Sequence, residues 1–170
     1  MDLYVVVLRL LHIVFGVLWV GFACFVPFVL MPSLMDAGPA AGPLMAAIQR
    51  RGLPKIMSAF AGTTILAGFL LLWRDSGGFK PEYMGSHMGI ALSTGALAAL
   101  IAFAIGFTVV KPAMTKAGLL SERIGAAAES ERGALMATIG ALRARGAAGG
   151  KWVAYLLLLA LALMAAARYL

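Results

Sequence analysis

The sequence predicts an all-α integral membrane protein, a four-helix bundle forming a single transmembrane domain over residues 1–170. Hydrophobic residues make up 62% of the chain and charged residues only 12%, whereas soluble domains hold about 45–50% and about 25%. Four apolar segments reach or approach the roughly 20 residues that cross about 30 Å of hydrocarbon. The lipid bilayer is therefore the first partner that the sequence predicts.

The predicted spans cover residues 3–30, 53–73, 85–110 and 152–170. Glycine and proline inside these segments are compatible with helices in lipid, because neighbouring helices satisfy the freed backbone groups. The first segment is interrupted only by Arg9, His12 and Pro27. It is longer than the roughly 7–15 apolar residues of a cleavable signal, so we expect it to be a span.

The distribution of Lys and Arg predicts the topology. The connections after the first and third spans, with Lys55 at the start of the second span, carry ten basic residues. The opposite side carries three, two between the second and third spans and Arg168 at the end of the fourth. Because basic loops stay in the cytoplasm, we expect a multi-pass protein of the cell inner membrane with both termini outside, in the periplasm. The net charge of +7 then reflects topology and anionic lipid, and no nucleic-acid partner is expected.

Residues 119–146, between the third and fourth spans, are rich in Ala, Leu, Glu and Arg, which are good helix formers. Apolar residues recur at near-helical spacing opposite charged ones. The pattern predicts one or two amphipathic helices on the cytoplasmic face of the membrane.

An internal repeat is visible in two motifs. Residues 29–38 resemble residues 109–118, and residues 42–48 resemble residues 133–139, with eleven more residues between the motifs in the second copy. Both copies follow an odd-numbered span. This predicts two helix–loop–helix repeats of the same orientation, related by an axis along the membrane normal. The alternative is chance similarity in a chain rich in Ala, Leu and Gly.

The candidate cofactor site is a stripe on the first span: Arg9, His12, Gly16 and Trp19 share one helix face. Ionisable residues inside spans are rare and usually functional. A b-type haem needs an imidazole ligand for its iron, a flat apolar wall and a cation for a propionate; His12, Gly16 with Trp19, and Arg9 would supply these. Alternatively, His12 hydrogen-bonds a neighbouring helix while Arg9 extends to the headgroups.

His87 is the only other histidine and the second candidate metal ligand, on the same side of the membrane as His12. Both histidines would ligate one iron only if the first helix is placed so that His12 lies near the outer edge of the hydrocarbon. Otherwise the second ligand is Met, water or absent, and His87 is an ordinary interfacial residue. Copper is the alternative metal, because thioethers such as those of Met57, Met84, Met88 and Met114 favour Cu(I), although methionine commonly serves packing.

Two stretches carry a family resemblance. The run Leu11-His12-Ile-Val-Phe-Gly16-Val-Leu-Trp19-Val-Gly21 resembles the first helix of the CopD-like membrane proteins. It is also similar to the HemJ-type protoporphyrinogen oxidases, four-helix proteins in which that histidine is implicated in haem binding. Residues 50–57 look like the HemJ-type segment before the second helix. The HemJ-type pattern opens the third helix with His-x-Lys, whereas this chain has His87-Met88-Gly89 there, with Gly89 in place of the lysine that the resemblance associates with the oxidase activity.

These observations predict a small membrane protein that binds haem b through His12 for electron transfer or porphyrin-related oxidation. Such an oxidoreductase implies a redox partner or a porphyrin, and a homo-oligomer is compatible with the sequence. The alternatives are a metal (copper-type) or small-solute carrier that binds at the repeat interface, and a structural subunit of a larger membrane complex. No motif identifies a catalytic residue.

Overall fold

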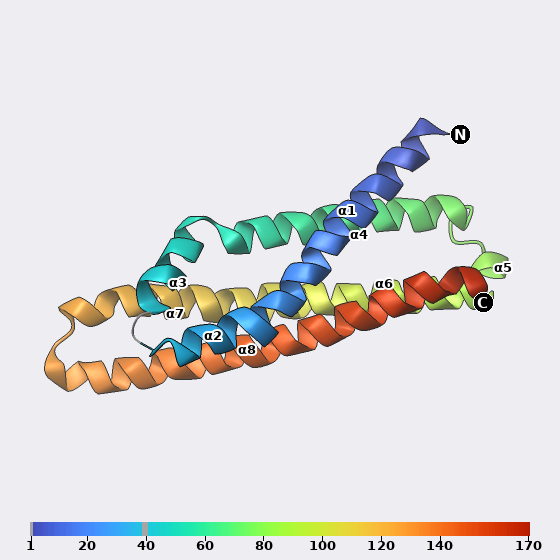
Figure 1. The fold of residues 1–170 in the computed structure, drawn as a ribbon. Helices are drawn as coiled ribbons and strands as arrows, with labels where there is room; N and C mark the ends of the chain where they lie inside the picture. Colours follow the sequence, from blue (N-terminus) through green and yellow to red (C-terminus); the bar gives the residue numbers. More distant parts are fainter. Residues whose placement is uncertain (1, 39–40) are drawn as a thin grey trace.

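The computed structural model describes residues 2–38 and 41–170, and all regular structure within these ranges is helical (Figure 1). This confirms the all-α prediction. The elements are α1 (Leu3–Phe25), the π turn η1 (Val26–Leu30), α2 (Met31–Asp36), α3 (Ala41–Arg50), α4 (Leu53–Asp75), α5 (Pro81–Met84), α6 (His87–Ile105), the π turn η3 (Gly106–Val110), α7 (Lys111–Arg123), the 3-10 turn η4 (Ile124–Ala126), α8 (Glu129–Ala166) and the 3-10 turn η5 (Ala167–Tyr169).

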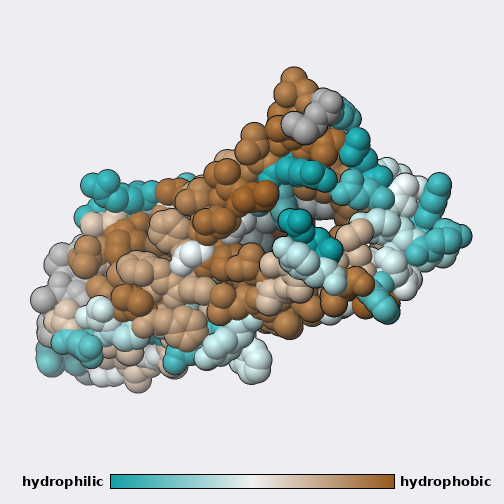
Figure 2. Space-filling model, turned by 45° about the vertical axis from the view of Figure 1, so that its right-hand side comes forward, coloured by the Kyte–Doolittle hydropathy of each residue, from teal (hydrophilic) through white to brown (hydrophobic). Residues whose placement is uncertain are grey.

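Four continuous helical segments are long and apolar enough to cross a membrane: Leu3–Asp36, Leu53–Asp75, His87–Ala126 and Glu129–Tyr169. The outer surface is accordingly apolar over most of the face in Figure 2, with polar residues at both ends and beside a hollow in the right-hand half. Because such a surface is stable only against lipid, the chain is a multi-pass membrane protein.

The helices associate as two pairs. α1 packs mainly on α4, and α6 packs along α8 (Figure 1). Small residues allow the close approach: a Cβ on Gly95 of α6 would lie 3.2 Å from the carbonyl oxygen of Ala160 on α8. Helices in lipid associate through such small-residue contacts. We call the end of the bundle with both termini and α5 the terminal end, and the end with α3, α7 and the start of α8 the hairpin end.

The first and third spans each contain a five-residue π turn. In η1 the Met31 N–H donates to the Val26 carbonyl, and in η3 the Lys111 N–H donates to the Gly106 carbonyl. Each turn is followed by a proline, Pro32 or Pro112, at the second position of the next helix. Proline lacks an N–H and clashes with the carbonyl four residues earlier, which explains the wider turn at both places.

The residues predicted to form an amphipathic segment are divided between α7, η4 and α8. α7 and the first half of α8 form an antiparallel hairpin, which extends the pair made by α6 and the second half of α8 (Figure 1). α8 begins at Glu129, well before the predicted start of the fourth span at residue 152, and runs unbroken through it. Glycines in this part of α8 let α7 approach closely: a Cβ on Gly146 would lie 2.7 Å from the Met114 sulfur. α8 has 38 residues. At about 1.5 Å per residue, its length exceeds the roughly 30 Å thickness of the hydrocarbon core.

The start of α6 depends on a glycine. The Gly89 N–H donates to Ser86 Oγ (3.0 Å), and this hydroxyl donates to the Tyr83 carbonyl (2.7 Å). A Cβ on Gly89 would overlap that carbonyl oxygen. We therefore expect Gly89→Ala to lower the stability by about 1–3 kcal/mol, measured by thermal unfolding in detergent. Gly21→Ala, whose Cβ meets no atom within 4 Å, is the control, and equal losses in the two variants would contradict this account.

Candidate functional site

His12 lies at the contact between α1 and α4. Its Nδ1 atom is 2.9 Å from the carbonyl oxygen of Thr64. Because a carbonyl oxygen can only accept a hydrogen bond, Nδ1 carries the proton in this contact. A neutral His12 ring therefore keeps its lone pair on Nε2.

The Nε2 atom of His12 is available to a ligand. The ring is half-buried, and the described residues provide no hydrogen bond to Nε2. The described part of the chain also contains no buried side-chain nitrogen or oxygen without a partner. Nε2 is therefore accessible at the surface of the helix pair, and an imidazole with this tautomer can ligate a metal through it.

Two glycines make room for this contact. A Cβ on Gly68 would lie 2.7 Å from Cε1 and 2.8 Å from Nδ1 of His12, so the ring packs directly on the α4 backbone. A Cβ on Gly16 would lie 3.4 Å from the Thr64 methyl group. Gly16, predicted to be part of a ligand wall, is thus covered by α4. Sequence reasoning missed Gly68, which lies on a different span from His12.

Trp19 lies deeper in the bundle and is only 5% exposed. It belongs to the central core that joins the two helix pairs, together with Ala23, Ala61, Ala102, Val153 and Leu157. It therefore serves packing and does not lie open beside His12.

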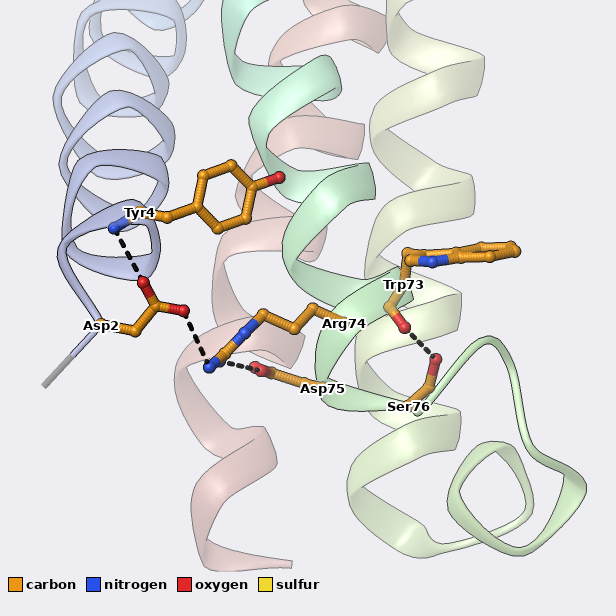
Figure 3. A network of polar contacts seen from close by, with 6 residues as sticks. All are labelled: Asp2, Tyr4, Trp73, Arg74, Asp75 and Ser76. Atoms are coloured by element: carbon orange, nitrogen blue, oxygen red, sulfur yellow. Dashed lines mark hydrogen bonds and ion pairs between the residues drawn. The ribbon is translucent and has the colours of Figure 1, made fainter.

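Arg9 is exposed, and the described residues provide it with no hydrogen bond or ion pair. The ion pairs at the terminal end belong to Arg74, which lies 3.5 Å from Asp2 and 3.6 Å from Asp75 (Figure 3). The Arg9 guanidinium therefore remains available to an anionic group.

Asp75 also acts on Tyr83 at this end of the bundle. Burial raises the pKa of the Tyr83 phenol, and the negative charge of Asp75 raises it further.

His87 is not brought to His12. It is exposed at the first turn of α6, beside Ala167 and Arg168 of η5, which follows α8. His12 contacts Thr64, eleven residues before the end of α4, which is about 16 Å along the helix from the terminal end. The two histidines thus lie at different depths and on different helix pairs.

An apolar hollow lies toward the hairpin end, in a place that sequence reasoning missed. This hairpin-end cavity has a volume of about 200 Å³ and is lined by both π turns together with parts of α1, α2, α3, α4, α6, α7 and α8. Met57 and Met114, two of the methionines considered for copper, line it with Met31 and Met45. Among the described residues, no three His, Cys, Asp or Glu side chains gather as a metal site.

Comparisons with protein-family models, curated proteins and solved structures give no match for this chain.

Proposed function

We propose that this membrane protein binds a b-type haem through Nε2 of His12 and serves electron transfer or a porphyrin-related oxidation. The hydrogen bond from His12 Nδ1 to the Thr64 carbonyl supports this proposal. Metal-ligating histidines almost always donate their other ring N–H to a carbonyl or carboxylate, which sets the tautomer and the ring orientation. Here α4 already supplies that second contact.

The other predicted residues fit a haem unequally. Arg9 is free to pair with a propionate, whereas Gly16 and Trp19 are covered by protein and support the helix packing. His87 lies too far along the bundle to be the second axial ligand of the same iron. A bound haem would supply a one-electron couple, tuned by its axial ligand and surroundings, and electron transfer would require a redox partner.

The proposal is tested by purifying the full chain after expression with ample haem. We expect a Soret band and about one haem per chain by the pyridine haemochrome assay, because His12 is the one proposed ligand. A colourless protein with a helical circular dichroism spectrum would refute the proposal.

We also propose that both termini lie in the periplasm, as the Lys and Arg distribution indicates. In a Cys24→Ala background, Glu82→Cys at the terminal end should react with a membrane-impermeant maleimide in spheroplasts. Ser130→Cys at the hairpin end should react only after lysis. The opposite pattern would invert the proposed topology.

We further propose that the two halves are structural repeats. The π turns lie at matching positions, 80 residues apart in the sequence. Five matching pairs line the same cavity: Ala23 and Phe103, Val26 and Gly106, Pro27 and Phe107, Leu30 and Val110, Met31 and Lys111. This supports an axis along the membrane normal that passes near the cavity.

A copper-type carrier is the second candidate, because four methionines line one cavity and thioethers favour Cu(I). The Lys111 ammonium on the same lining opposes a cation, which is why haem at His12 is the primary proposal. Cu(I), added without oxygen, should raise the thermal stability of the chain but not of Met57→Leu/Met114→Leu if copper is the cargo.

A further inference from the structure

The hairpin-end cavity is almost entirely apolar. Its lining includes Trp19, Phe22, Phe103 and Phe107, the four methionines already named, and only one charged residue, Lys111. Apolar cavities stay dry and take up apolar ligands, and methionine side chains adapt to flexible ones. A volume of about 200 Å³ is below the roughly 300–1,000 Å³ of pockets for whole small molecules. This volume suits a segment of a hydrocarbon chain better than a porphyrin.

Lys111 gives the cavity its charge. It is half-buried, it begins α7 directly after the π turn η3, and its Nζ atom lies 4.8 Å from the centre of the Phe107 ring. Among the described residues, no carboxylate pairs with it. A basic side chain at the end of a span lies at the depth of the lipid headgroups, where it attracts anionic lipid.

We propose that the hairpin-end cavity holds an acyl chain of an anionic phospholipid from the adjoining leaflet, with Lys111 bound to its phosphate. The apolar lining accommodates the chain, and the single cation selects the headgroup. His12 is not on the lining, so this site is independent of the haem proposal.

Trp19 is a built-in reporter of the cavity. It lines the cavity but is only 5% exposed, whereas Trp73 and Trp152 are 51% and 65% exposed. In a Trp73→Phe/Trp152→Phe chain, Trp19 is the remaining indole, and its low exposure leaves little contact with bulk lipid. We would reconstitute this protein in phosphatidylcholine vesicles that contain a minor fraction of one brominated lipid. That lipid is either brominated phosphatidylglycerol or brominated phosphatidylcholine, and the quenching of Trp19 fluorescence is measured for each.

Brominated phosphatidylglycerol should occupy the cavity about five-fold more readily than brominated phosphatidylcholine, as expected for one basic residue near the surface. Lys111→Gln should remove this preference, while Lys116→Gln, an exposed charge on the same helix, should keep it. Gly106→Leu should fill the cavity and abolish quenching, because a Cβ there meets no atom within 4 Å. Gly62→Leu, equally unobstructed but off the lining, is the control.

Equal quenching by the two lipids, or no quenching of Trp19, would overturn the proposal. So would a Lys111→Gln chain that keeps the preference. Circular dichroism and thermal unfolding confirm that each variant is folded, so that a lost signal reports on the cavity.

Discussion

Replacing His12 with alanine is expected to reduce the haem content of the purified protein to background, because Nε2 of His12 is the proposed axial ligand. The change also removes the hydrogen bond to Thr64, which costs only about 1 kcal/mol, so the bundle should remain folded. Haem content by the pyridine haemochrome assay, with circular dichroism of the same sample, measures both effects.

Two matched variants separate ligation from electrostatics. Arg9→Gln should keep the Soret band but bind haem more weakly, because only the pairing with a propionate is lost. His87→Ala should have no effect, because His87 lies at the terminal end on the other helix pair. A His12→Ala protein that retains its haem would contradict the proposal. If the parent chain binds no haem and His12→Ala only destabilises it, His12 serves helix packing.

Gly68→Ala is expected to be among the most destabilising small substitutions in the chain. Its Cβ would lie 2.7 Å from Cε1 and 2.8 Å from Nδ1 of His12, so the ring must move and lose its bond to Thr64. Overpacking costs about 1–3 kcal/mol, and the lost hydrogen bond adds about 1 kcal/mol. Thermal unfolding in detergent measures the loss, and a haem titration should show weaker binding.

The control for Gly68→Ala is Gly62→Ala on the same helix, where a Cβ meets no atom within 4 Å. Removing a helix-interior glycine there should stabilise the chain by about 0.5–1 kcal/mol. In a His12→Ala background the obstructing ring is gone, so Gly68→Ala should no longer destabilise. Destabilisation that persists in the double variant would show that His12 does not pack on Gly68.

Much of the fold follows from the sequence. The four apolar runs correspond to the four long helices, since a run of about 20 apolar residues has few alternatives to a helix in lipid. Helix ends were less predictable. The drop in hydropathy before Trp152 is not a helix boundary, since α8 begins at Glu129. In that stretch Gly146 and Gly149 are contact points for α7 and the π turn η3.

The site was predictable only where it depends on one helix. The cost of an ionisable group in a span marked His12 as a residue that needs a partner, and the hydrogen bond to a neighbouring helix, one of the two alternatives from the sequence, is present. Three residues of helix turn through about 300°, so Arg9 stands at the edge of the His12 face and is exposed. The Gly68 contact and the hairpin-end cavity depend on how separate spans pack, which spacing along one helix does not specify.

The most direct test of His12 as the haem ligand is a haemin titration of the purified apo-protein in detergent. The His87→Gln chain, in which His12 is the only histidine, should develop a Soret band that saturates at about one haem per chain. The same titration of folded His12→Ala/His87→Gln should give no saturable band. Equal titration curves for the two proteins would contradict the account.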